Sequence, residues 1–269
     1  MTLRKVALSV ETVAIPSVAE TCQKLRNLLK EAVEEEKAPL VLLSGGLDTS
    51  IIALLAKKGA EELTGLTIAF DDESEDLSYA RRVARFLSLK HEVHYFDCEE
   101  LREAMIKVSE YESSSFASPG LTTLASTYLA LRVASSFASE VLTGDGADEL
   151  FFGYSSLINF APLINFAPDL EAPDISTALD NDFPRALGEG LGIKVCSPFL
   201  SPEVVRFGQT IPLQYKVRRE ENKLYGKWIL RKAFQDYLPR EIVWREKVPF
   251  DRGCGVLRCA QGFFQAPIP

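Results

Sequence analysis

The sequence has little histidine, and this scarcity limits the metal sites that it can build. Its 269 residues include two histidines, His91 and His94, and five cysteines at widely scattered positions. A structural zinc site needs four cysteine or histidine ligands at short spacings, and this pattern supplies none. The sequence therefore predicts a fold without a structural metal.

Long apolar runs are also absent. The run from Pro39 to Leu43 is among the longest, and it is far shorter than the roughly 20 residues of a membrane helix. The N-terminus, MTLRKVALSVE, has no apolar core of a cleavable signal. With 46% hydrophobic residues, a chain of this length can bury a full core. We expect a soluble, cytoplasmic protein without a membrane partner.

Net positive charge is confined to the C-terminal third. The chain has a net charge of −8, but residues 201–258 contain 13 Lys and Arg against 7 Asp and Glu, which gives +6 there and −14 elsewhere. This segment could face a polyanion, although most charged runs are solvated helix surfaces. Accordingly, Lys227 and Arg231 are interpreted as helix-surface or interdomain residues.

Apolar periodicity predicts alternating helices and strands as far as residue 144. The expected helices are 18–37, 50–58, 76–87, 99–110 and 122–136, and the expected strands are 39–44, 63–70, 91–96 and 139–144. This alternation predicts an α/β fold with a doubly wound, mostly parallel sheet and helices on both faces. Ligands bind beyond the carboxyl ends of such strands, where Ser44, Phe70 and Gly144 lie.

The predicted domain organisation has four parts. Residues 1–37 lead into a nucleotide-binding α/β core at 38–156, and residues 184–269 form a helical C-terminal part of the same domain. Between them, 157–183 begins with two copies of LINFAP and continues rich in proline and aspartate, which predicts a mobile loop. Two copies of a six-residue unit are too few for a solenoid, so a local duplication explains them better.

Two glycines separate the first strand from the next helix, in SGGLDTS at 44–50. Glycine lets the backbone approach a ligand, and the first N–H groups of a helix attract an anion. Ser44, Thr49 and Ser50 add hydroxyl donors. Asp48 would repel a phosphate unless a divalent cation lay between them, which points to a magnesium-bound phosphate chain. The alternative is a plain turn in which Asp48 caps the helix.

Five motifs in order resemble one enzyme family. SGGLDTS is similar to the signature loop of the ATP pyrophosphatase (PP-loop) superfamily, whose members split ATP between its α- and β-phosphates. LTGDGADELFFGY at 142–154 resembles the synthetase domain of asparagine synthetases and β-lactam-forming synthetases. SPFLSPEVV, KWILRKAF and LPREIVWREKVPF match further on, so that the resemblance covers most of residues 20–250. It implies the PP-loop fold and an ATP-dependent, AMP-forming carbon–nitrogen ligase.

The resemblance also implies the site residues. Those expected to bind ATP are Leu43, Ser44, Gly45, Gly46, Asp48, Thr49, Ser50, Ile68 and Gly144. Asp48 and Asp148 would hold Mg²⁺, and Lys247 would stabilise charge as pyrophosphate leaves. Asp145 stands where the family usually has a glutamate and would act as acid or base. In the plainer alternatives, Asp148 starts a helix and Lys247 is a surface lysine.

The sequence departs from the family near the expected acyl substrate. Lys194, Cys196 and Ser201 stand where the family has Glu, Arg and Asp. Because an ammonium in place of a carboxylate inverts the local electrostatics, we expect altered acceptor recognition. The acyl substrate is expected near Asp145 and Lys194, opposite the ATP loop.

The resemblance implies ATP and Mg²⁺ as cofactors, a small carboxylate such as aspartate as substrate, and ammonia or an amine as nitrogen donor. Thr2 follows Met1 where glutamine-using relatives have their nucleophilic cysteine. We therefore expect no glutaminase domain, and a separate glutaminase subunit could supply ammonia. The state of assembly is open, and a homo-oligomer is compatible with the sequence.

Two other functions are compatible with the sequence. A tRNA-modifying PP-loop enzyme could use the basic C-terminal third, and Cys254 and Cys259 of CGVLRC could relay sulfur. The match of the whole chain to amide-forming enzymes argues against this nucleic-acid function. A nucleotide-binding sensor that has lost catalysis would explain the departures near the acyl substrate, but it would not need Lys247.

Overall fold

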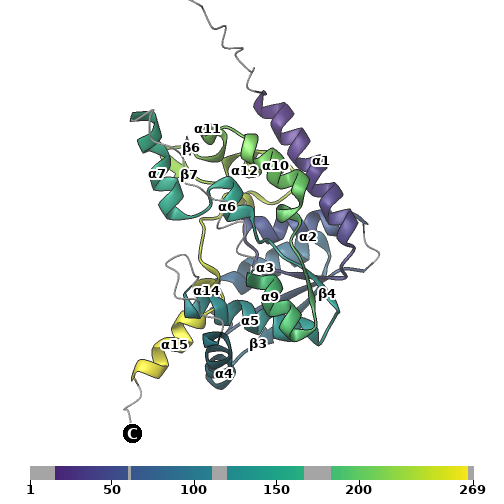
Figure 1. The fold of residues 1–269 in the computed structure, drawn as a ribbon, viewed down its shortest axis with the longest axis vertical. Helices are drawn as coiled ribbons and strands as arrows, with labels where there is room; N and C mark the ends of the chain where they lie inside the picture. Colours follow the sequence, from purple (N-terminus) through teal and green to yellow (C-terminus); the bar gives the residue numbers. More distant parts are fainter. Residues whose placement is uncertain (1–15, 60–61, 111–119, 167–182, 266–269) are drawn as a thin grey trace, which may run out of the picture.

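The computed structural model describes residues 16–59, 62–110, 120–166 and 183–265. A sheet lies at its centre (Figure 1). It has five strands in the order β3-β2-β1-β4-β5. The strands are β1 (Leu40–Leu42), β2 (Thr64–Ala69), β3 (Lys90–Tyr95), β4 (Glu140–Leu142) and β5 (Lys194–Cys196). All neighbouring strands in it are parallel, which confirms the predicted doubly wound α/β fold.

Strand order reverses between β1 and β4. The chain proceeds from β1 through β2 to β3 on one side of the sheet, and β4 and β5 are added on the other side of β1. The two central strands pair Val41 with Leu142. At such a reversal the connections leave on opposite faces, and a crevice opens beyond the carboxyl ends of the two strands.

Helices cover both faces of the sheet, with a separate apolar core on each. One core contains Val41 and Leu43 and is covered by α1 (Val18–Glu36), α2 (Leu47–Gly59), α3 (Glu75–Leu87), α10 (Pro202–Thr210), α12 (Trp228–Phe234) and α13 (Arg240–Val243). The other contains Leu40 and Leu66 and is covered by α4 (Cys98–Ser109), α5 (Leu121–Ser135), α9 (Phe183–Leu191), α14 (Phe250–Gly253) and α15 (Val256–Gln265). Figure 1 shows α1 and α12 above the sheet and α4 and α15 below it. Burial on both faces explains why β1 is apolar at every position.

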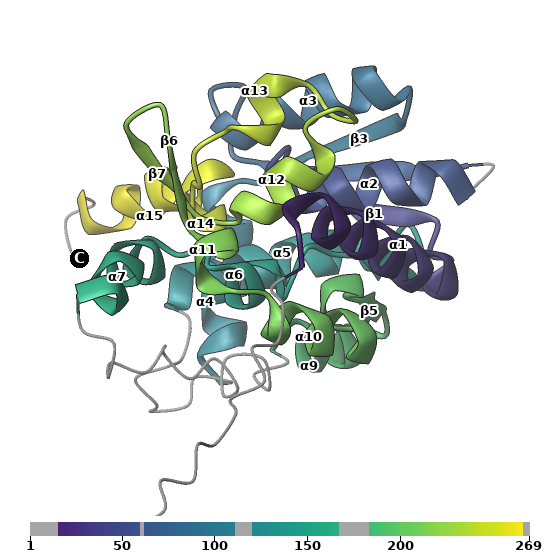
Figure 2. The same cartoon turned by 90° about the horizontal axis from the view of Figure 1, so that it is seen from above.

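A small lobe lies beside this sandwich, and the sequence did not predict it. It consists of α7 (Ser155–Phe166), α11 (Leu213–Lys216) and the antiparallel hairpin of β6 (Arg218–Glu220) and β7 (Lys223–Tyr225). Its apolar centre is formed by Phe152, Ala161 and Val217. In Figure 2, α7 and the hairpin lie on the same side of the molecule.

The lobe corrects two predictions. Residues 157–166 are helical, not part of a loop, because residues of the first LINFAP copy pack against the centre of the lobe; the rest of the predicted loop, 167–182, lies outside the described residues. The C-terminal part is also less helical than expected, since it contains β5 and the hairpin. Glu221 and Asn222 have φ of 46° and 68°, the left-handed values of a two-residue hairpin turn.

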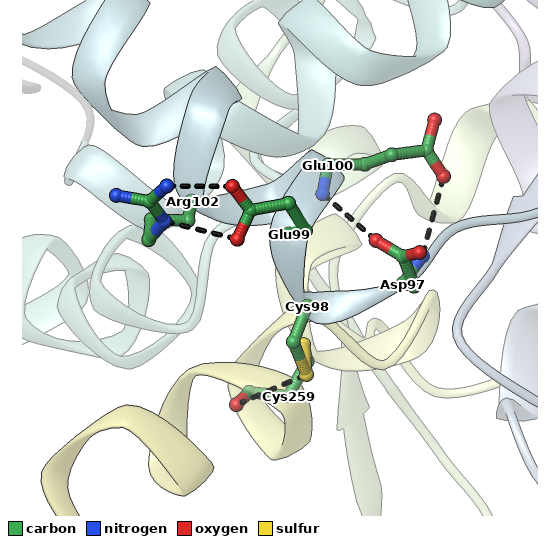
Figure 3. Close-up of a disulfide and its surroundings, with 6 residues drawn as sticks. All are labelled: Asp97, Cys98, Glu99, Glu100, Arg102 and Cys259. Atoms are coloured by element: carbon green, nitrogen blue, oxygen red, sulfur yellow. Dashed lines mark hydrogen bonds and ion pairs between the residues drawn. A yellow bond between two sulfur atoms is a disulfide. The ribbon is translucent and has the colours of Figure 1, made fainter.

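A disulfide between Cys98 and Cys259 ties α15 to the start of α4 (Figure 3). Their Cα atoms are 5.8 Å apart, and the two residues are separated by 161 positions in the sequence. Cys254 is a buried free thiol. The prediction of a sulfur-relaying thiol pair in CGVLRC is therefore wrong, because one thiol is enclosed in the core and the other is in a disulfide. Within the ranges that the structure describes, no helix is both long and apolar enough to cross a membrane.

Candidate active site

A cavity of about 410 Å³ opens at the reversal of strand order, beyond the carboxyl ends of β1, β2 and β4. It brings together ten of the predicted site residues, namely Leu43, Ser44, Gly46, Asp48, Thr49, Ile68, Gly144, Asp145, Asp148 and Lys247. The small lobe contributes Ile158, Asn159 and Tyr225 to its wall. Gly45 and Ser50 are the two predicted residues that do not line the cavity.

The glycine loop is held by its own hydroxyl groups. Gly46 N–H donates to Ser44 Oγ (3.2 Å), and Ser44 Oγ lies 3.1 Å from Thr49 Oγ1. The fully buried Ser50 donates its hydroxyl to the Gly46 carbonyl (2.6 Å), so it stabilises the loop from behind. Gly45 has φ of 68°, and a Cβ there would collide with the backbone of α3. Backbone freedom and close packing together explain why glycine is needed at this position.

Asp48 lies inside the first turn of α2, which begins at Leu47. The alternative in which it caps the helix is therefore wrong. Its carboxylate faces Lys227, whose Nζ lies 2.5 Å from Asp48 Oδ2 and 2.6 Å from Asp148 Oδ1. On the far side, Lys247 Nζ lies 2.6 Å from Asp148 Oδ2. We call these four side chains, Asp48, Lys227, Asp148 and Lys247, the charge chain.

Asp148 and Lys247 are held in their charged forms by their neighbours in the charge chain. Burial alone would raise the pKa of Asp148, but the ammonium groups of Lys227 and Lys247 outweigh it and hold that pKa well below its ordinary value. Burial would likewise lower the pKa of Lys247, and the carboxylates of Asp148 and Asp48 instead raise it. Two carboxylates thus face two ammonium groups, and the charge chain has no net charge.

Lys227 and Arg231 are not surface residues, which corrects their interpretation from the sequence. Their exposed fractions are 3% and 5%, and both line the cavity. The sequence contains a signal for this, because α12 is apolar almost all round, with Trp228, Ile229, Leu230, Ala233 and Phe234 all buried. Such a helix has little solvated surface, so a cation at its buried positions needs a partner inside the protein.

Arg231 and Arg245 hold residues 243–247 in place, and we call these residues the Lys247 segment. The Arg231 guanidinium donates to the carbonyls of Gly226 (3.0 Å), Val243 and Arg245 (3.0 Å). Arg245 in turn donates to the Ser44 carbonyl (3.2 Å), which joins this segment to the glycine loop. The cavity is thus lined by five cations of the basic C-terminal third, namely Lys223, Lys227, Arg231, Arg245 and Lys247.

Arg245 also forms a buried ion pair with Asp76 at the start of α3. Its Nη2 lies 2.7 Å from Asp76 Oδ1, and its guanidinium lies 4.0 Å from the centre of the Tyr79 ring. Burial raises the pKa of Asp76 to about 6, although Arg245 acts to lower it. This ion pair therefore supports the Lys247 segment most strongly at pH values above about 6, at which the Asp76 carboxyl is ionised.

The three departures from the family lie away from the cavity. Lys194 begins β5 beside Glu140, at the amino end of the sheet, and its Nζ lies 2.8 Å from Glu36 Oε2. Cys196 is fully buried, and burial followed by the nearby Glu36 raises its thiol pKa to about 12. Ser201 precedes α10. The expectation that Lys194 lies opposite the ATP loop is wrong, because parallel pairing with β4 puts it at the other end of its strand.

The donor groups fit a magnesium ion that arrives with phosphates. Asp48 Oδ1 is buried without a hydrogen bond, which leaves an oxygen lone pair available at the cavity. Nowhere in the described parts of the chain do three or more His, Cys, Asp or Glu side chains form a group that could hold a metal. Mg²⁺ is commonly held by one or two carboxylates with substrate phosphates completing its shell. Asp48 and Asp148 match that donor set.

The sequence is similar to those of known proteins. The sequence profile of the asparagine synthase family matches residues 24–189 and 186–262. The chain belongs to the asparagine synthase family. A probable glutamine-hydrolysing asparagine synthetase of Schizosaccharomyces pombe is 30% identical over 277 residues, which cover 90% of this chain and 48% of that protein. The glutamine-hydrolysing asparagine synthetase of Sandersonia aurantiaca is 31% identical over 268 residues, which cover 90% and 49%.

The chain thus spans about half the length of the curated family members that it matches. Among solved structures, the NH3-dependent NAD synthetase of Campylobacter jejuni superposes with a TM-score of 0.35 at 16% identity, over 83% of this chain and 98% of that one.

Proposed function

We propose that this protein is an ATP-dependent ligase that forms an amide through an acyl-adenylate. The observation that carries the proposal is the charge chain, which joins both predicted magnesium ligands and the predicted catalytic lysine at one cavity beside the glycine loop. Membership of the asparagine synthase family supports ATP-dependent amide ligation as the general class.

In this proposal the triphosphate lies at the start of α2. The N–H groups of its first turn have no partner within the helix and carry the positive end of the helix dipole. Leu43, Ile68 and Gly144 line the same cavity and would contact the adenosine. Asp48 and Asp148 would hold Mg²⁺, which supplies positive charge to the phosphate oxygens.

The reaction begins when a substrate carboxylate oxygen attacks the α-phosphorus. The bond from this phosphorus to the oxygen that bridges to the β-phosphate breaks, and pyrophosphate leaves with the electron pair. Lys247 is suited to stabilise that departing charge, because it stays protonated and is held in place by Asp148 and the Arg231 contacts. A prepositioned cation needs no reorganisation as the charge develops.

In the second step ammonia or an amine attacks the acyl carbon, and AMP leaves. The nitrogen must lose a proton as the amide forms, and Asp145, which is half-buried at the cavity, is proposed as the base that accepts it. We propose aspartate or a related amino acid as the carboxylate. Free ammonia, an amine, or ammonia from a separate glutaminase subunit would supply the nitrogen.

Exchange of labelled pyrophosphate into ATP tests the first step. We expect exchange that depends on one carboxylate in a panel of amino acids, and a loss of at least about a hundredfold in Lys247→Met, as is typical when a group that stabilises transition-state charge is removed. Lys90→Met is the matched control, since Lys90 is an exposed lysine at the amino end of β3.

ATP binding without exchange for any amino acid in the panel would contradict the ligase and favour a nucleotide sensor. Salt-sensitive binding of tRNA together with absent exchange would favour a nucleic-acid substrate instead.

A further inference from the structure

The two predicted magnesium ligands already share a cation, the ammonium of Lys227. Because this nitrogen lies 2.5 Å from one carboxylate and 2.6 Å from the other, the two oxygens are held within about 5 Å of each other. Two carboxylates at this spacing repel each other unless a positive charge lies between them. Lys227 therefore occupies the position between Asp48 and Asp148 that a bridging cation would otherwise take.

The ammonium of Lys227 is closely confined. Its side chain is 4% exposed, compared with 33% for Lys247. Gly153 packs against Lys227 Cε and Asp148 Oδ1 so tightly that an added Cβ would collide with both. The Lys227 backbone is fixed as well, since its N–H donates to the Phe151 carbonyl (2.8 Å).

These contacts determine what could displace the ammonium. A free divalent cation that approached Asp48 and Asp148 would meet the ammonium groups of Lys227 and Lys247, and it would separate Lys227 from both of its carboxylate partners. A triphosphate provides a new partner for Lys227, because its oxygens accept strong hydrogen bonds from ammonium groups. If metal and phosphate arrive together, the carboxylates can bind the metal and the ammonium groups can bind the phosphate oxygens. Every charge then keeps a partner of opposite sign.

We propose that Lys227 is a positioning residue that holds Asp48 and Asp148 in place and excludes free divalent cations, so that the metal enters only together with the nucleotide. This inference rests on the proposed function, because it assumes that the two carboxylates serve a metal–nucleotide complex. It assigns to Lys227 a task different from that of Lys247, since Lys227 pairs with both carboxylates and the ion pair of Lys247 is with Asp148.

Binding of Mn²⁺, followed by the electron paramagnetic resonance signal of the free ion, tests the proposal on the whole chain. Without nucleotide, we expect Lys227→Met to bind Mn²⁺ at least about tenfold more tightly than the wild type, because a neighbouring positive charge has been removed. Lys227→Arg retains a cation and should exclude Mn²⁺ as the wild type does. The double variant Lys227→Met/Asp48→Asn should lose the gained affinity.

The wild type provides a second measurement that requires no variant to fold. Its affinity for Mn²⁺ should rise at least about tenfold when a non-hydrolysable ATP analogue is added. Equal Mn²⁺ affinity with and without the analogue, or equal affinity of the wild type and a folded Lys227→Met, would overturn the proposal.

The two proposals fail in different ways. If pyrophosphate exchange proceeds while Lys227→Met leaves Mn²⁺ binding unchanged, the ligase stands and the exclusion of free metal is wrong. If Lys227→Met gains Mn²⁺ affinity but no carboxylate supports exchange, the exclusion stands and the ligase is wrong.

Discussion

Removal of the Arg245 guanidinium should destabilise the protein in a manner that depends on pH. Arg245→Met leaves Asp76 without its ion-pair partner at a position where its exposed fraction is 3%. The same substitution frees the Lys247 segment from the Ser44 carbonyl. We therefore expect both a loss of stability and a loss of pyrophosphate exchange.

The size of the effect follows from the burial and spacing of the pair. Two unit charges about 4 Å apart in an effective dielectric of about 20 attract each other by about 4 kcal/mol. Breaking a buried pair by removing one partner costs about 3–5 kcal/mol, because the other charge is left buried. The free energy of unfolding of Arg245→Met should therefore fall by about 4 kcal/mol at pH 8.

At pH 5 the free energy of unfolding of Arg245→Met should fall by less than it does at pH 8. The pKa of Asp76 is already raised to about 6 by burial, and without Arg245 it rises further. The folded variant then holds a proton that the unfolded chain, with an ordinary carboxyl pKa near 4, gives up. Its stability falls as pH increases from about 4 through the raised folded pKa, so the gap to the wild type widens toward pH 8.

Urea unfolding at pH 5 and pH 8 measures this gap, and a double-mutant cycle with Asp76→Asn isolates the pair. Asp76→Asn removes the stranded charge, so the double variant Arg245→Met/Asp76→Asn should recover most of the stability at pH 8. A coupling energy below about 1 kcal/mol, or an equal loss at both pH values, would refute the reasoning, because exposed pairs give values of that size.

Two further predictions concern stability away from the cavity. Burial lowers the pKa of Lys216 from 10.5 to about 8, so its charge costs stability below pH 8 and costs nothing once both folded and unfolded forms are neutral. Lys216→Met should raise the free energy of unfolding by up to about 3 kcal/mol at pH 7 and by less than about 0.5 kcal/mol at pH 10.5, where about half of the unfolded lysine is still protonated, in urea titrations at the two pH values. The Cys98–Cys259 disulfide closes a loop across 161 positions, so its reduction should destabilise the oxidised protein by up to about 5 kcal/mol. Thermal unfolding with and without reductant checks this, and Cys98→Ser/Cys259→Ser should not respond to the reductant.

Much of the fold was predictable from local pattern. The alternation of short apolar segments with amphipathic ones predicted the parallel sheet, because a strand covered by helices on both faces is apolar throughout its length. The glycine loop was predictable too, since Gly45 needs a backbone conformation that other residues rarely adopt. The hairpin turn at Glu221 and Asn222 was missed because neither residue is the glycine that usually marks such a turn.

Part of the site was predictable from the positions of Asp48 and Asp148 relative to the expected strands. Asp48 and Asp148 each lie in the first turn of the helix that follows a strand, and the carboxyl ends of parallel strands lie at one edge of the sheet. The two carboxylates could therefore be expected on the same side. The sequence could not show that β1 and β4 are neighbours, and it is this pairing that brings the two loops to one cavity.

The sequence by itself determined the type of each element up to residue 144, because element type there depends on backbone preference and on apolar spacing over a few residues. The tertiary structure decided which distant groups meet. Lys227 reaches Asp48 across 179 positions, and Lys194 lies at the far end of the sheet because of its register with β4. The apolar residues of α12 could indicate from the sequence that a cation there is buried, but only the packing shows that Lys227 meets two carboxylates.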